Sequence, residues 1–220
     1  MNNRIKDEAE LLAGFCDPDN LREQYRHPFL NEDTGNVWAT NAHVLISVAP
    51  GCLKETYETS KLKEPPEFNE HTCDHIITMS MLDDALAAVP QIEEQIEVQK
   101  AIKCEECEGS GEVEWEYTDS KYRVHFRSDV CPECDGEGIL QEAVYKSTGR
   151  MVLDPKASIG INDANLLVRD IVKLIDAMQF FGVDQVRLVR YKSITKWVLD
   201  DNIFIILASV FGEPKARIKV

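Results

Sequence analysis

ASIGINDANLLVRDIVKLIDAMQFFG, residues 157–182, is the stretch that decides the fold we expect for this chain. Alternating small and apolar residues predict a strand over 157–161, and Asn162 or Asp163 is then expected to cap a helix that runs to Phe181. Gly182 stands where helices commonly end on a glycine in the left-handed conformation. Apolar positions recur every three or four residues along the predicted helix and indicate one buried face, made of Leu167, Ile171, Leu174, Ile175 and Met178.

Three more strands are expected after this helix, over residues 186–191, 194–199 and 203–210. The C-terminal part of the chain therefore has the order β-α-β-β-β. The N-terminal part looks like a weaker copy, with a helical pattern over 5–15 followed by strands around 28–30 and within 37–48. We accordingly expect an α+β protein built from two halves of the β-α-β-β-β type.

The segment between these halves contains a repeated cysteine unit. Cys104-Glu-Glu-Cys107-Glu-Gly-Ser-Gly and Cys131-Pro-Glu-Cys134-Asp-Gly-Glu-Gly share the pattern C-x-x-C-x-G-x-G. Two residues between thiolates let one tight turn aim both sulfurs at a single ion, and two such turns complete the Cys₄ shell that structural Zn²⁺ prefers. The sequence therefore predicts one structural zinc ion bound by Cys104, Cys107, Cys131 and Cys134.

The residues between the two cysteine units alternate in the manner of a β-hairpin. Val113, Trp115 and Tyr117 alternate with glutamates, and a second alternating run over 121–127 follows a turn near 118–120. We expect the acidic first strand to pair with the basic second strand across the ladder. Strands over 95–103 and 139–146 lead into and out of this hairpin. The expected organisation is thus a discontinuous domain, 1–103 and 139–220, with an inserted zinc hairpin, 104–138.

Residues 104–138 resemble the cysteine-rich region of the DnaJ-type co-chaperones, whose C-x-x-C-x-G-x-G units bind zinc in pairs. That family has four such units and this chain has two, so the resemblance implies one zinc ion. The family's J domain needs a His-Pro-Asp turn, and the nearest match here is His27-Pro28-Phe29, so a full co-chaperone is excluded. What survives as an alternative is a protein-binding module that presents an aromatic surface, Trp115, Tyr117, Tyr122 and Phe126.

The two flanks resemble a domain of the bacterial DNA sliding clamps, the β-subunit of polymerase III. The residues that carry the likeness are Ala39-Thr-Asn-Ala-His-Val-Leu45, similar to an Ala-Thr-Asp-Gly-His-Arg-Leu strand of that family, and the final β-α-β-β-β unit. This resemblance implies a clamp-like fold and a role in DNA replication or processing. The chain departs from the family at Val44, where the clamp strand has Arg. A clamp subunit has three such domains and this chain has room for one, so a DNA-encircling ring is disfavoured.

Charge is distributed unevenly along the chain. The 24 Lys and Arg against 39 Asp and Glu give a net charge of −15, and the acidic excess lies before residue 139. A generally electropositive nucleic-acid binder is therefore excluded, because phosphate affinity comes from clustered Lys and Arg. Any DNA contact must come from the C-terminal third, whose basic cluster is Arg187, Arg190, Lys192 and Lys196.

Composition and motifs narrow the remaining possibilities. With 44% hydrophobic residues, no membrane-length apolar run and a polar N-terminus, the chain is expected to be a soluble cytoplasmic protein. It has no glycine-rich phosphate loop, nucleophile elbow or H-E-x-x-H helix, so a non-enzymatic module is expected. Three hypotheses stay open: a clamp-like module that docks onto nucleic acid or a replication-type protein, a purely protein-binding zinc module, and an enzyme whose site the sequence does not reveal.

Overall fold

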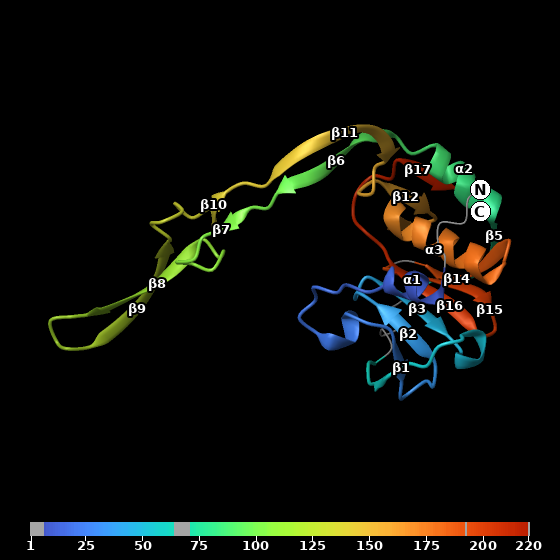
Figure 1. Ribbon diagram of the computed structural model, residues 1–220, viewed down its shortest axis with the longest axis horizontal. Coiled ribbons are helices and arrows are strands. Elements are labelled where there is room, and N and C mark those ends of the chain that lie inside the picture. The colour runs from blue at the N-terminus through green and yellow to red at the C-terminus, as the bar shows by residue number, and fades with distance from the viewer. Residues whose placement is uncertain (1–6, 64–70, 192, 220) are drawn as a thin grey trace. The chain divides into compact units, whose positions relative to one another are not determined.

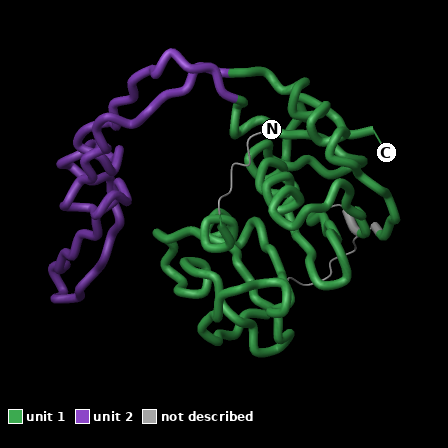
Figure 2. The backbone as a smooth tube through the Cα atoms, turned by 45° about the vertical axis from the view of Figure 1, so that its right-hand side comes forward, with its two compact units in different colours: residues 1–91, 153–220 green, residues 92–152 purple. Residues whose placement is uncertain are grey.

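The computed structural model describes residues 7–63, 71–191 and 193–219, and the chain divides into two units (Figure 2). Unit 1 comprises residues 1–91 and 153–220, and unit 2 comprises residues 92–152. Both helices and strands are present, with more strand than helix among the described residues, so the protein is α+β. None of the described helices combines the length and the apolar character needed to cross a membrane.

An eight-stranded sheet forms the centre of unit 1 (Figure 1). All of its pairings are antiparallel except that of β1 with β4. Strands from the two ends of the chain join at β3 and β16, where Ile46 lies opposite Ile205. The strand order is β4 (Thr59–Ser60), β1 (Phe29–Asn31), β2 (Val37–Thr40), β3 (Val44–Val48), β16 (Ile203–Ala208), β15 (Ile194–Asp200), β14 (Gln185–Tyr191) and β5 (His71–Thr78).

The strands expected within 37–48 and over 186–210 are confirmed as β2, β3, β14, β15 and β16. The polar, proline-containing sequence of residues 54–72 predicts a loop. In the structure this segment is interrupted by β4 and ends in β5, and its residues 64–70 lie outside the described residues. Two short 3₁₀ turns, Glu23–Tyr25 and Pro50–Cys52, complete the N-terminal part.

Unit 1 also contains, among its described residues, a second sheet and three helices. The sheet has the order β13 (Ala164–Leu167), β12 (Ser158–Ile161) and β17 (Ala216–Ile218), and β17 runs parallel to β12. The helices are α1 (Glu8–Ala13), α2 (Met79–Ala87) and α3 (Val168–Phe181). The sequence of residues 79–89, which precedes Pro90, predicts a short helix, and α2 confirms it. Helix α1 confirms a helix within 5–15, although residues 5 and 6 lie outside the described residues.

The predicted start of the long helix is wrong. Asn162 and Asp163 do not cap α3; they form the two-residue turn of the β12–β13 hairpin, in which Asn162 has φ 48° and Ile161 pairs with Ala164. Asn and Asp are favoured both at helix N-termini and in tight hairpin turns, and here the pairing of β12 with β13 selects the turn. Helix α3 begins after Leu167, which makes no side-chain cap, and ends as expected at Gly182 with φ 69°. The C-terminal order from β12 onward is therefore β-β-α-β-β-β-β, with β17 as the last strand.

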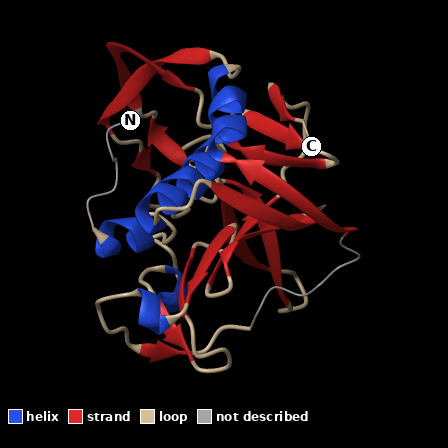
Figure 3. Ribbon diagram, turned by 90° about the vertical axis from the view of Figure 1, so that its right-hand side faces the viewer, coloured by secondary structure: helices blue, strands red, loops and turns tan. Residues whose placement is uncertain are grey.

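The main core lies between the helices and one face of the eight-stranded sheet (Figure 3). Leu174 and Met178 of α3 and Ile46 and Ile205 of the sheet are all fully buried in it. The opposite face of the sheet has a smaller cluster made of Phe29, Trp38, Leu45 and Ile206. Because successive strand residues point to opposite faces, β2, β3 and β16 contribute to both clusters and read as continuous apolar runs.

A buried carboxylate fixes the loop that follows the second 3₁₀ turn to helix α1. Glu8 is 6% exposed and accepts hydrogen bonds from the backbone N–H of Lys54 and Glu55, at 2.7 and 3.2 Å, and from the Tyr57 hydroxyl. Burial raises the pKa of Glu8, but these donors outweigh it, so the net pKa is lowered from the usual value of 4.5. The loop is thus held by a carboxylate that stays charged.

Unit 2 consists of three successive two-stranded ribbons (Figure 1). In the first, β6 (Gln91–Gln99) pairs with β11 (Val144–Leu153), and in the second, β7 (Ile102–Lys103) pairs with β10 (Ile139–Gln141). The third is the hairpin of β8 (Glu112–Thr118) and β9 (Val124–Val130). Unit 2 therefore includes the flanking strands as well as the segment 104–138.

Candidate metal centre and binding surfaces

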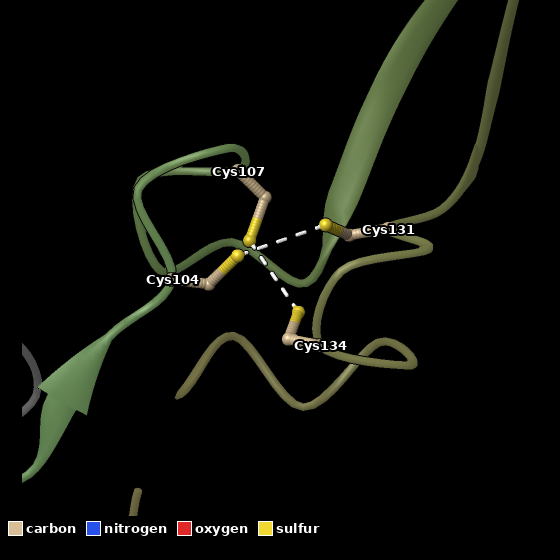
Figure 4. Close-up of side chains that lie close together, drawn as sticks. All are labelled: Cys104, Cys107, Cys131 and Cys134. Carbon is tan, nitrogen blue, oxygen red and sulfur yellow. Dashed lines mark hydrogen bonds between the residues drawn. The ribbon is translucent and has the colours of Figure 1, made fainter. Parts of the chain in front are cut away.

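The four cysteines of the repeated unit come together between the second and third ribbons of unit 2 (Figure 4). Their sulfur atoms all lie within 4.8 Å of one another, and each side chain is at most 8% exposed. The Sγ atoms of Cys104 and Cys131 are 3.8 Å apart, and those of Cys107 and Cys134 are 3.7 Å apart. Four sulfurs bound at ~2.3 Å to one tetrahedral ion lie about 3.8 Å from each other, so the donor set fits a metal ion.

The two cysteine turns hold each other through reciprocal backbone hydrogen bonds. The N–H of Cys104 donates to the carbonyl of Gly138 at 3.0 Å, and the N–H of Cys131 donates to the carbonyl of Gly111 at 2.9 Å. The first residue of each turn is therefore bound to the last residue of the other. This pattern repeats the internal symmetry of the sequence in three dimensions.

The glycines that end each turn allow this close approach. A Cβ atom on Gly111 would lie 2.2 Å from the carbonyl oxygen of Gly136, and one on Gly138 would lie 2.5 Å from that of Gly109. All four glycines have positive φ, between 74° and 89°. Side-chain-bearing residues rarely adopt that conformation, and real Cβ atoms essentially never come so close to an oxygen. The G-x-G spacing is thus required by the contact between the turns.

Each turn also donates a backbone N–H to one of its own sulfurs. Gly111 N–H donates to Cys107 Sγ at 3.3 Å, and Gly138 N–H donates to Cys134 Sγ at 3.2 Å. Burial raises the pKa of the Cys107 thiol, but the N–H groups of Gly111 and Gly109 oppose it, and the net pKa is lowered to about 6. Such donors stabilise a thiolate, which is the form of cysteine that binds metals.

The hairpin register differs from the ladder of charges expected from the sequence. Glu112, Glu114 and Glu116 lie opposite Val130, Ser128 and Phe126, so the acidic strand does not pair with the basic one. The turn spans residues 119–123, which is longer than expected. The basic residues Lys121 and Arg123 therefore lie in the turn and not on the second strand. Asp119 accepts hydrogen bonds from the backbone N–H groups of Lys121 and Arg123 and from the Arg123 side chain. The tip is therefore organised around one carboxylate, whose pKa these donors and His125 lower to about 2.

The four aromatic residues proposed for protein binding do not share one face of the hairpin. Trp115 and Tyr117 lie on the same face and are 51% and 54% exposed. Phe126 pairs with Glu116 and therefore lies on the other face, and Tyr122 lies in the turn. The structure thus brings together only Trp115 and Tyr117, and the Tyr117 ring stacks on His125 at 5.1 Å between centroids.

The basic cluster proposed for nucleic acid is placed only in part. The Arg187 side chain lies 3.8 Å from Asp74, and the Lys196 ammonium lies 4.2 Å from the ring centre of Phe204. Arg190 is opposite Lys196 in the strand register. Lys192 lies outside the described residues. A nucleic-acid role for these four residues stays a prediction.

A cavity that the sequence did not reveal lies on the face of the eight-stranded sheet opposite the main core, where Leu45 and Ile206 belong to the smaller cluster. Its volume is about 320 Å³, and it is open on one side. Its apolar walls are formed by Leu45 of β3, Ile206 of β16, Ile194 of β15 and Leu62 of the loop before residue 64. Its polar lining residues are Tyr25, Thr40, His43 and Lys63. Residues 39–45, which join β2 to β3, are the sequence signal that could have indicated it, because they supply Thr40, Ala42, His43, Val44 and Leu45 to the lining.

Asp170 is the most deeply buried acidic side chain near the start of α3. It is 4% exposed, and its carboxylate lies 3.8 Å from Nε of Arg169. Burial raises its pKa above the usual 3.8, although Lys173 and Arg169 act in the opposite direction. Within the described part of the chain, the four cysteines form the only group of three or more cysteine, histidine or acidic residues close enough to bind a metal.

A scan of the sequence against protein-family models finds no match. A search of curated proteins likewise finds no significant match.

Proposed function

We propose that this protein is a non-enzymatic binding module with a clamp-like body that docks a partner protein in the cavity of unit 1, and with one structural zinc ion in unit 2. The clamp resemblance adds the expectation of a role in DNA replication or processing. The observation that carries the docking proposal is the cavity itself. At about 320 Å³ it lies at the lower end of the range of about 300–1,000 Å³ found for ligand sites.

The lining favours a peptide with apolar side chains beside a carboxylate. Leu45, Leu62, Ile194 and Ile206 offer an apolar floor and walls, which gain free energy when they are covered. Lys63 supplies a cation among the lining residues, and it suits an acidic group of the occupant. Because Leu45 and Ile206 also belong to the small cluster packed against Trp38, the floor is rigid and needs little ordering on binding.

The docking proposal is tested with a short peptide that contains Leu, Phe and Asp, titrated into isotope-labelled protein. Amide shifts confined to residues 40–45 and 206–208 are expected. Ala208→Arg narrows the cavity and should abolish them, whereas Phe211→Arg, at a fully exposed position outside the lining, should leave them unchanged. No shifts at millimolar peptide, or equal loss in both variants, would count against docking at this site.

Zinc is the ion that the four-sulfur site supports best. Four thiolates in a tetrahedral, buried arrangement are typical of structural zinc, which leaves no ligand position open for a reaction. Cys104, Cys107, Cys131 and Cys134 would hold the ion, and its role would be to stabilise ribbons that bury too little apolar surface to fold alone. Elemental analysis should find about one equivalent of zinc per chain, and its absence from freshly purified protein would refute this part.

A second candidate function is protein binding of the chaperone type through the hairpin. The observation that favours it is the half-exposed state of Trp115, Tyr117 and Phe126, because monomeric proteins seldom leave several large aromatic side chains in water. Suppression of the aggregation of an unfolded client protein, lost in Trp115→Ser, would support this function. DNA docking through Arg187, Arg190, Lys192 and Lys196 is less favoured, since Arg187 and Lys196 already have neighbours within unit 1.

A further inference from the structure

Strand β8 has one unpaired edge. Among the described residues, β9 is the only strand that pairs with β8, and the β8–β9 sheet has two strands. The backbone N–H and C=O groups on the other edge of β8 therefore have no strand to bind. An open edge of this kind accepts an extended segment from another protein by strand addition, in which main-chain hydrogen bonds supply affinity and alternate side chains supply specificity.

The two faces of β8 have opposite chemistry. Glu112, Glu114 and Glu116 form a row on one face, and Val113, Trp115 and Tyr117 form a row on the other. Successive members of each row are about 7 Å apart along the strand. An added strand has the same period, so each of its side chains meets one of these rows in strict alternation.

Strand β9 supplies no cation to the glutamate row and leaves the aromatic row partly exposed. It places Val130, Ser128 and Phe126 opposite the glutamates, and no ion pair in the described part of the chain includes Glu112, Glu114 or Glu116. On the other face, Trp115 and Tyr117 remain about half exposed even with β9 in place. The acidic row lacks cations and the aromatic row lacks cover, which are the two things an added strand can supply.

We infer that β8 binds, by strand addition, an extended partner segment in which Lys or Arg alternates with apolar residues. The basic side chains lie beside the glutamate row, and the apolar side chains cover Trp115 and Tyr117. The occupant is identified by charge and by period: an acidic row needs basic neighbours, and cross-strand pairs of opposite charge stabilise a sheet whereas like charges destabilise it. This surface belongs to unit 2 and is separate from the cavity of unit 1, so the two proposals can fail independently.

The probe is the capped peptide Lys-Val-Lys-Val-Lys-Val-Lys, added to the zinc-loaded full chain. The chain has 3 Trp residues, of which Trp38 and Trp197 are fully buried and Trp115 is half exposed. Tryptophan fluorescence therefore reports the binding surface directly, and a blue shift is expected. The block peptide Lys-Lys-Val-Val-Val-Lys-Lys has the same composition without the alternation and should bind on the order of tenfold more weakly. Equal affinity of the two peptides would overturn the inference.

Two charge reversals of equal size separate strand addition from general attraction to an acidic protein. Glu114→Lys acts on the glutamate row and should weaken the alternating peptide on the order of tenfold, because it replaces a favourable cross-strand pair with a repulsive one. Asp129→Lys makes the same change in net charge on β9, on the opposite face, and should have a much smaller effect. Glu114→Gln, with zinc content unchanged, guards against misfolding and should give an intermediate loss. Equal effects of Glu114→Lys and Asp129→Lys would refute the model.

Backbone methylation tests the geometry of addition. In an extended segment the N–H groups of alternate residues point to the same edge, so those of the lysines and those of the valines face opposite sides. Methylating one set should abolish binding, and methylating the other should leave it nearly unchanged. If both sets have the same effect, the peptide does not add as a strand and the inference fails.

Discussion

Replacing Gly111 with alanine tests whether the contact between the two cysteine turns, and not glycine flexibility alone, sustains the metal centre. The new Cβ would lie 2.2 Å from the carbonyl oxygen of Gly136, so one turn must move. Gly149 offers a matched control. It has φ 74°, close to the 78° of Gly111, but a Cβ there meets no atom within 4 Å. Both variants carry the conformational cost of a left-handed alanine, about 1–2 kcal/mol, and only one carries the clash.

The extra cost at Gly111 follows from the hydrogen bonds that the movement breaks. Cys131 N–H donates to the Gly111 carbonyl at 2.9 Å, and Gly111 N–H donates to Cys107 Sγ at 3.3 Å. A neutral hydrogen bond contributes about 0.5–1.5 kcal/mol and one to a charged group about 1.5–3 kcal/mol, so their joint loss costs about 2–4.5 kcal/mol. At 1.4 kcal/mol per tenfold change, metal affinity should fall about 30- to 1,600-fold.

The assay is a competition titration of zinc-loaded protein against a chromophoric chelator. Gly111→Ala should release the ion at far lower chelator concentration than wild type, whereas Gly149→Ala should be close to wild type because its residue lies away from the ligands. If the two variants had the same affinity, the clash would not matter and the interlocked turns would not be the source of the site's stability.

Three further variants test other parts of the structure. Cys131→Ser should abolish metal binding and unfold the hairpin, while the fluorescence of Trp38 and Trp197 stays that of buried tryptophans. If the fluorescence of these two residues also changed to that of exposed tryptophans, unit 1 would depend on the metal. Glu8→Gln should destabilise unit 1 in chemical denaturation by about 1.5–3 kcal/mol at neutral pH, because it replaces charge-assisted hydrogen bonds. Since the pKa of Glu8 is lowered in the folded state, its contribution is present above the unfolded value of 4.5 and should fade as the pH drops below it; a pH-independent difference would contradict this account. Asp170→Asn should raise the melting temperature at pH 8 and have little effect near pH 3. The reason is that a raised pKa means the charged form is disfavoured in the folded state; a lower melting temperature at pH 8 would show that the charge stabilises the fold.

Sequence reasoning succeeded where the determining contacts are local. The four clustered cysteines lie three residues apart within each turn, and the end of α3 is set by Gly182, whose φ of 69° needs no distant partner. The strands around Trp38 and Trp197 are also visible as short apolar runs. In each of these cases one segment of the chain contains all the information that the structure uses.

Sequence reasoning failed where two local solutions compete or where distant segments meet. Asn162 suits a helix cap and a hairpin turn equally, and only the pairing of β12 with β13 and β17 decides between them. The hairpin register depends on the length of the turn around Asp119, which collects its donors from residues up to six positions away. The cavity joins Tyr25, Leu45 and Ile206, and no local pattern links residues so far apart in the chain.

The reciprocal bonding of the two cysteine turns places the hydrogen bonds that close the candidate metal centre outside the hairpin that connects them. Cys104 is bound to Gly138 and Cys131 to Gly111, so both hydrogen bonds lie outside the segment between Glu112 and Val130, from which Val113 packs against the cysteine cluster. A connection of another length or sequence can replace that loop, provided that its ends leave side by side as a paired ladder. Hairpins of different length and binding preference could therefore be exchanged at this position without changes to the cysteine turns or to unit 1.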